Sequence, residues 1–212
     1  MIHHLALRWL VIGLFVLSAA VFGLVIVTKR RPWTSVVSHA LHVVMAVAMV
    51  VMAWPWSAQL PTTGPAVFFL LAAVWFVTLA VVEARTTPLR ALNGYHALMM
   101  LATAWMYAIM NGHLLPVRSS SQQPDMSMPG MDMPGMDMAP MNTPISSGSP
   151  LWFSAVNWIG TVGFAVAAVF WTYRYFTERQ HEAIRSKSLD NLSQATMAAG
   201  MTILFLATLF WV

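Results

Sequence analysis

Residues 38–56 read SHALHVVMAVAMVVMAWPW and contain no Asp, Glu, Lys or Arg. Together with the three residues before them, they form an apolar window over 35–56. A helix of about 20 residues crosses the hydrocarbon core of a bilayer, which is roughly 30 Å thick. The window therefore predicts a transmembrane helix, and its histidines and methionines are the first candidates for a functional role.

The same kind of window recurs along the whole chain. Of its 212 residues, 58% are hydrophobic and 8% are charged, and the mean hydropathy is +0.67. A soluble fold of this length cannot bury so much apolar surface, so we expect an all-α polytopic membrane protein with six transmembrane helices. We place these helices at 5–28, 35–56, 65–83, 91–112, 151–173 and 192–212. The first window continues until Lys29, and we interpret it as a retained helix instead of a cleaved signal peptide.

The distribution of Lys and Arg predicts the orientation of these helices. With the N-terminus outside, only Arg8 and Arg118 fall on the outer side, and nine basic residues fall on the inner side. The inner residues are Lys29, Arg30, Arg31, Arg85, Arg90, Arg174, Arg179, Arg185 and Lys187. Because cytoplasmic loops retain positive charge, we expect both termini and the loop at 113–150 to lie outside the plasma membrane. The pI near 10 then reflects this asymmetry and does not indicate a nucleic-acid partner.

A methionine-rich loop divides the predicted chain into three parts. A four-helix portion covers 1–112, the extracytoplasmic loop covers 113–150, and a two-helix portion covers 151–212. Seven of the 17 methionines lie in the loop, at Met126, Met128, Met131, Met133, Met136, Met138 and Met141. Packing does not explain a methionine run among Pro and Gly, and soft sulfur ligands select Cu(I). We expect the loop to bind Cu(I), with a low-complexity linker as the alternative interpretation.

Histidines and methionines also share one face of the predicted helices 35–56 and 91–112. Their spacing of three and four residues places them together at 100° per residue, and the first of these faces is predicted to reach Trp56. The candidate ligands are His39, His42, Met49, Met52, His96, Met99, Met106 and Met110. Ionisable residues inside a membrane usually face a partner or a cavity, which favours an intramembrane metal site. Methionine is also a common packing residue, so helix packing stays the alternative.

Two of these segments carry a resemblance to a known family. The strings SHALHVVMAVAMVVMAWPW and YHALMMLATAWMYAIM resemble segments of an uncharacterised family of actinobacterial polytopic membrane proteins, known as a domain of unknown function. The resemblance covers about the first 112 residues and the last two helices. It implies an integral membrane protein of an actinobacterial envelope and supplies no activity. Separately, the loop resembles the methionine motifs of eukaryotic high-affinity copper importers and bacterial periplasmic copper-resistance proteins.

These observations predict a metal-binding membrane protein that is not an enzyme. The chain has no Cys, which excludes thiolate sites, and it contains no ATPase, protease or nucleotide motif. We expect Cu(I) to be collected by the loop and held or passed on by the Met/His faces, in copper uptake, transfer or tolerance. A haem-binding cytochrome with His39 or His42 and His96 or Met99 as axial ligands stays open. So does an accessory subunit that binds other envelope membrane proteins.

Overall fold

The computed structural model describes residues 5–28, 32–54, 56–57, 60–83, 86–110, 151–180 and 185–210. Apart from short connecting residues, the secondary structure in these ranges is helical, with a 3₁₀ segment at 56–57, and it includes no strand. The helices are α1 (Leu5–Thr28), α2 (Trp33–Met52), α3 (Thr63–Thr78), α4 (Thr87–Met110), α5 (Leu151–Gln180) and α6 (Arg185–Phe210), and the π-helix η2 (Leu79–Glu83) continues α3. Five of the described helices are long and apolar enough to cross a membrane, α4 being the exception. The prediction of an all-α polytopic membrane protein is confirmed.

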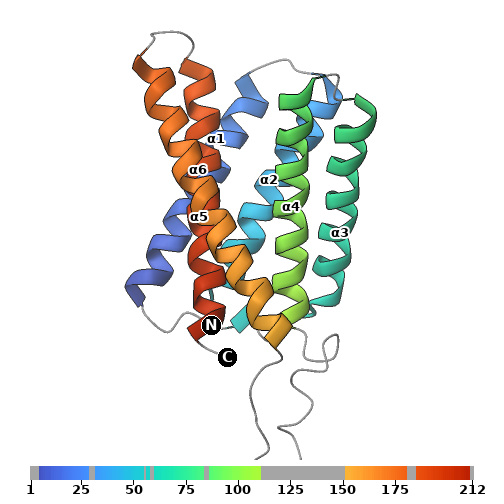
Figure 1. Ribbon diagram of the computed structural model, residues 1–212, viewed down its shortest axis with the longest axis vertical. Coiled ribbons are helices and arrows are strands. Elements are labelled where there is room, and N and C mark those ends of the chain that lie inside the picture. The colour runs from blue at the N-terminus through green and yellow to red at the C-terminus, as the bar shows by residue number, and fades with distance from the viewer. Residues whose placement is uncertain are drawn as a thin grey trace, which may run out of the picture.

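Successive helices run in opposite directions through a single bundle (Figure 1). Helices α2, α4 and α6 therefore share one direction. The end of α4, the start of α5, the start of α1 and the end of α6 lie at the same end of the bundle, which we call the loop end (Figure 1). We call the opposite end, where α5 is followed by α6, the hairpin end.

Several helix boundaries differ from the sequence prediction, and the largest differences are in α2, α5 and α6. Helix α2 ends at Met52, so Trp56 does not continue its buried face and is 50% exposed. The residue before a proline is biased away from helical geometry, and Pro55 follows closely after Met52. Helices α5 and α6 extend past the predicted apolar windows into polar sequence at the hairpin end, because hydrogen bonds within a helix can continue beyond the residues that lipid covers.

Methionine is segregated from the outer surface of the described bundle. The large exposed apolar side chains are Leu, Val, Ile, Phe, Trp and Tyr, and no methionine is among them. Eight methionines are buried instead, at Met45, Met49, Met52, Met99, Met100, Met106, Met197 and Met201. They all come from α2, α4 and α6. The interior is therefore lined with thioethers on the three helices that run in one direction.

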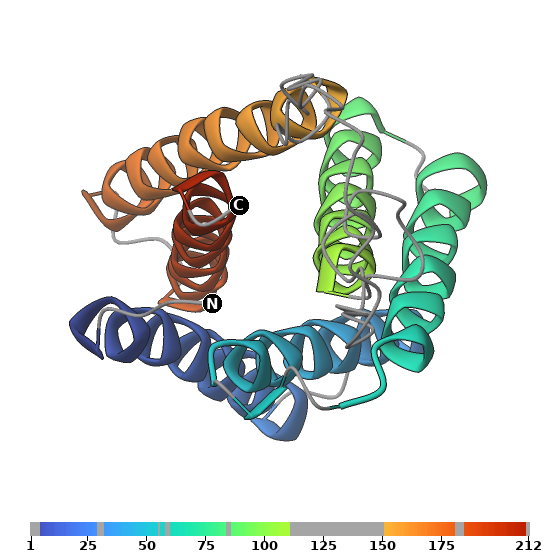
Figure 2. The same ribbon diagram turned by 90° about the horizontal axis from the view of Figure 1, so that it is seen from below.

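Helix α4 is as long as α1 but more polar, and it occupies an inner position. It contacts α2 through the hydrogen bond from the Tyr107 hydroxyl to the Ala48 carbonyl (3.5 Å). It contacts α5 through Trp105 Nε1, which donates to Asn157 Oδ1 (3.3 Å). Figure 2 shows α4 and α6 facing each other across the middle of the bundle. Polar side chains in a membrane protein gain most when they face other helices, which accounts for this placement.

Candidate functional site

A cavity of about 870 Å³ lies between α1, α2, α4, α5 and α6 in the half of the bundle nearest the hairpin end. Most of its lining is apolar. The polar groups that line it include three histidines, His39, His42 and His96. The fold thus brings the three predicted intramembrane histidines to one space, because α2 and α4 both begin at the hairpin end and each carries its histidines within its first turns.

His42 and His96 are in direct contact at the base of this cavity. Their ring centroids are 4.4 Å apart and their planes meet at 76°. Both side chains are buried, with 2% and 9% of their surface exposed. The ring of Phe76 packs edge-on against both of them, with centroids 5.3 Å away in each case. The pair is consequently held in a fixed arrangement by aromatic neighbours.

The backbone of α2 sets which nitrogen of His42 carries the proton. Its Nδ1 lies 2.7 Å from the carbonyl oxygen of Ser38, one turn earlier, so Nδ1–H donates and Nε2 keeps a free lone pair. His39 repeats this geometry, with its Nδ1 at 2.6 Å from the Ser35 carbonyl. Histidines that bind metals usually donate their other ring N–H to a carbonyl or a carboxylate. With Nδ1–H donating to the backbone, both imidazoles of α2 have a deprotonated Nε2, which is one of the two nitrogens through which histidine binds metals.

Gln194 of α6 completes the inner site. Its Nε2 lies 3.0 Å from His96 Nε2, so the amide donates to the ring and His96 Nε2 is an acceptor. Four buried polar atoms around the cavity have no hydrogen-bond partner among the described residues: His42 Nε2, Tyr95 Oη, Asp190 Oδ1 and Gln194 Oε1. Leaving such an atom unpaired costs about 1–3 kcal/mol. Three of the four are pure acceptors, so the cavity suits a cation or a hydrogen-bond donor.

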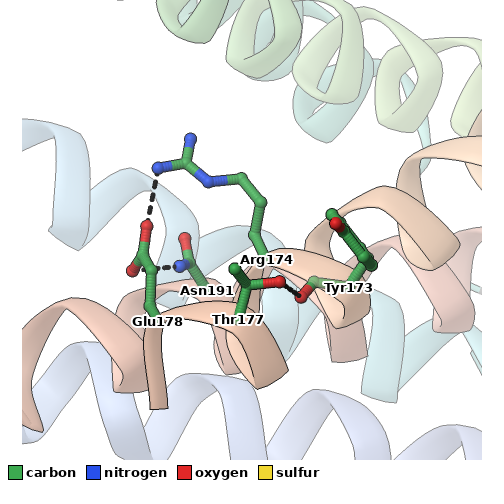
Figure 3. Close-up of polar contacts among 5 residues, drawn as sticks. All are labelled: Tyr173, Arg174, Thr177, Glu178 and Asn191. Atoms are coloured by element: carbon green, nitrogen blue, oxygen red, sulfur yellow. Dashed lines mark hydrogen bonds and ion pairs between the residues drawn. The ribbon is translucent and has the colours of Figure 1, made fainter. Parts of the chain in front are cut away.

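The hairpin end of the cavity is charged. The Arg174 guanidinium pairs with Glu178 at 2.7 Å, and the Asn191 amide donates to the other Glu178 oxygen at 2.7 Å. Figure 3 shows these groups linking α5 to α6, with Glu178 accepting from both partners. Arg174 also lies over the ring of Trp171, 5.7 Å from its centroid. An exposed pair of this kind contributes about 0.3–0.5 kcal/mol, so it shapes the rim more than it stabilises the fold.

Thioethers continue the site towards the loop end. Met45 follows His42 by three residues on α2, Met99 follows His96 on α4, and Met197 follows Gln194 on α6. Residues at this spacing are neighbours on one helix face, and all three methionines are 0% exposed. Met49, Met52, Met106 and Met201 continue the same faces and are buried too. We call the eight buried methionines the methionine column.

The predicted candidates fall into three groups. His42, His96, Met49, Met52, Met99 and Met106 are buried in the interior. His39 and Met110 are partly buried. The three histidines line the cavity, and none of the five methionines of this set does. The loop ligands from Met126 to Met141 lie outside the described residues. Among the residues that the structure describes, no cluster of three His, Cys, Asp or Glu side chains exists that would hold a metal ion.

The sequence prediction missed Gln194 and Asp190. Both line the cavity and both precede or begin the apolar part of α6, so they fell outside the window or near its edge. A signal was present, because Asp190, Gln194, Met197 and Met201 are spaced by four, three and four residues. That spacing defines one helix face, and it continues the methionine face of α6 into polar ligand atoms.

Comparison with known proteins identifies the family of this chain and assigns no activity to it. The family model described as "Domain of unknown function (DUF5134)" matches residues 34–208. The uncharacterised proteins Rv0970 of Mycobacterium tuberculosis and Mb0995 of Mycobacterium bovis are each 65% identical over 213 residues, covering 99% of this chain and 99% of theirs. No solved structure matches the chain. The resemblance to an actinobacterial membrane family is confirmed: the chain belongs to the family of proteins with the DUF5134 domain.

Proposed function

We propose that this protein binds Cu(I) through its methionine-rich loop and through an intramembrane site centred on His42 and His96, and that it serves copper uptake, transfer or tolerance without being an enzyme. The observation that carries the proposal is the contact of two buried imidazoles, one with a free Nε2 lone pair, directly beside a column of buried thioethers. Imidazole and thioether together suit copper better than Mg²⁺ or Ca²⁺, which prefer oxygen ligands.

The ligand set also argues against a structural zinc site. Such sites are closed by four Cys, His or carboxylate ligands, and the described residues offer no cluster of three. Cu(I) accepts fewer ligands and accepts thioethers. Two rings that bind one ion tetrahedrally through bonds of about 2 Å have centroids about 5 Å apart. The observed centroid distance of 4.4 Å is close to that value, which supports a shared ion between the two rings.

The same distance weighs against haem between these two rings. Two axial bonds of about 2 Å on opposite sides of one iron would hold the ring centroids roughly 6 Å apart, with a flat macrocycle between them. His42 and His96 instead touch each other and are flanked by Phe76. In this proposal a small ion bridges the two rings, with no macrocycle between them.

Three stations follow for the ion in this proposal. The loop thioethers collect Cu(I) outside, the methionine column carries it through the interior of the bundle, and the histidine pair holds it beside the cavity. The loop end, where α4 ends and α5 begins, would be extracytoplasmic, and the cavity would open towards the cytoplasm. Any movement of copper would follow its gradient.

The test is Cu(I) binding by the purified full-length protein in detergent, in anaerobic competition with a chelator. Replacing the seven loop methionines with Leu should remove the loop-bound copper and leave a smaller fraction bound. In that background, His42→Ala or His96→Ala should remove the remaining copper, because each deletes one of two nitrogen ligands. His181→Ala, which changes a histidine outside the proposed site, is the matched control and should have no effect.

Each result is informative about a different class of function. Retention of the full copper content after both His42→Ala and His96→Ala would remove the intramembrane site. Copper-free protein with a Soret absorption band would support the cytochrome reading, and neither metal nor haem would support an accessory subunit.

A further inference from the structure

Gln194 forms a hydrogen bond with His96 Nε2, which is one of the two nitrogens that the proposed metal site needs. Its amide donates to His96 Nε2 across 3.0 Å, so a metal ion that binds this nitrogen must displace the amide. His42 Nε2, the other proposed ligand, has no hydrogen-bond partner among the described residues. Of the two Nε2 atoms, that of His96 accepts a hydrogen bond and that of His42 does not.

A second acceptor for the same amide lies one helical turn away on α6. Asp190 precedes Gln194 by four residues, and Gln–Asp pairs at this spacing form hydrogen bonds along a helix face. Both side chains line the cavity. The Asp190 Oδ1 atom is buried and has no partner in the described part of the chain, although burying an unpaired carboxylate oxygen is costly. A displaced Gln194 amide would supply the missing donor.

We propose that Gln194 is a gate of the histidine site, with its amide donating to His96 Nε2 in one position and to Asp190 Oδ1 in the other. This inference rests on the proposed Cu(I) site and names the residues that regulate it. Metal binding breaks the N–H···N bond to His96, forms the metal–nitrogen bond at Nε2, and moves the amide to Asp190. The amide proton stays on Gln194, and no electron is transferred.

The gate lowers the energetic cost of releasing the ion. When the metal leaves, the amide returns to His96, so the ligand nitrogen is satisfied without the ion and the energetic cost of dissociation falls. Asp190 lines the same cavity as the rim residues Arg174, Glu178 and Asn191, and its part in the gate is to accept the displaced amide. A gate of this kind suits a protein that passes copper on more than one that stores it.

The test is a double-mutant cycle on Cu(I) affinity, in the full-length protein whose seven loop methionines are replaced by Leu. Gln194→Leu removes the competing donor and should tighten Cu(I) binding roughly three- to tenfold, the equivalent of one neutral hydrogen bond. Asp190→Ala removes the second acceptor and should weaken binding by a similar factor. In the Gln194→Leu background, Asp190→Ala should have no effect, because the amide that links the two positions is absent.

Controls separate the gate from packing and from charge. Thr196→Val changes another buried side chain of α6, whose hydroxyl bonds to Ser193 within the helix, and should leave affinity unchanged. Asp190→Asn keeps an acceptor oxygen and should bind Cu(I) nearly as the parent does. This variant and Asp190→Ala decide the question even if Gln194→Leu does not fold.

The outcomes distinguish the gate from the site itself. If the parent protein, with its seven loop methionines replaced by Leu, binds no Cu(I) that depends on His42 or His96, both the proposed function and the gate are overturned. Intact histidine-dependent binding with unchanged or weaker affinity in Gln194→Leu would overturn the gate alone. Equal weakening by Asp190→Asn and Asp190→Ala, or an Asp190→Ala effect that persists without Gln194, would show that charge acts directly and would also overturn the gate.

Discussion

At the scale of single residues, the decisive question is whether His42 packs or binds. A packing histidine in a membrane interior satisfies both ring nitrogens with neighbouring groups, since an unpaired polar atom there is costly. His42 satisfies Nδ1 through Ser38 and leaves Nε2 without a partner among the described residues. That lone pair suits a hydrogen-bond donor or a cation, and the copper ion of the proposed site would be such a cation.

A residue-scale prediction concerns the loop. A peptide covering residues 123–142 should bind Cu(I) in competition with a weak chelator, and changing its seven Met to Leu should abolish binding while preserving apolarity. Because thioethers take up no protons, binding should change little between neutral and mildly acidic solution. Aspartate ligands would lose metal on acidification. Equal binding by the Leu peptide would assign the metal to Asp125, Asp132, Asp137 or the backbone.

At the scale of elements, α6 is central because it touches α1 on one side and α5 on the other. Glycines permit both close approaches. A methyl group added at Gly200 would lie 2.7 Å from the Phe15 ring of α1, and one added at Gly160 of α5 would lie 2.7 Å from the Phe205 ring of α6. Small residues at helix contacts let backbones approach closely in membranes. The position of α6, and with it Gln194, depends on these two contacts.

An element-scale prediction tests this packing. Gly200→Ala should destabilise the protein by about 1–3 kcal/mol, because Phe15 is fully buried and cannot move aside freely. The measurement is the midpoint of thermal unfolding in detergent. Gly13→Ala is the matched control on α1, since nothing lies within 4 Å of the added methyl group.

The compensating variant sharpens the same experiment. Phe15→Leu combined with Gly200→Ala should recover part of the lost stability, because the smaller side chain makes room for the methyl group. A Gly200→Ala protein as stable as the Gly13→Ala control would contradict the contact between α1 and α6.

At the scale of the whole molecule, the even number of helices places both described ends and the loop attachments at one end of the bundle (Figure 1). The chain is a multi-pass membrane protein, and which end faces the cytoplasm remains the prediction drawn from the basic residues. The proposed direction of copper transfer depends on it, because the helix ends that flank the loop lie opposite the end of the bundle that holds the cavity.

Cysteine labelling tests this orientation directly, since the chain has no native Cys. Ser120→Cys, in the loop, should react with a membrane-impermeant thiol reagent in intact cells, and Ser186→Cys, near the start of α6, should react only after the cells are permeabilised. The reverse pattern would place the cavity outside and would invert the proposed route.

The sequence by itself determined the membrane class, the all-α architecture and the inward faces of α2 and α4. These properties follow from hydropathy and from helical periodicity, which are local. Helix ends were less predictable: α2 stops before Trp56, and α5 and α6 continue into polar sequence, because lipid thickness limits the apolar window but not the helix.

Only the tertiary structure decided what those faces meet. The contact between His42 and His96 joins two helices, and the hydrogen bond from Gln194 to His96 joins residues 98 positions apart. No local pattern specifies such pairs, since they depend on how α2, α4 and α6 pack and rotate against each other. The sequence therefore supplied the candidate ligands, and packing alone selected which nitrogens lie together and which amide competes for them.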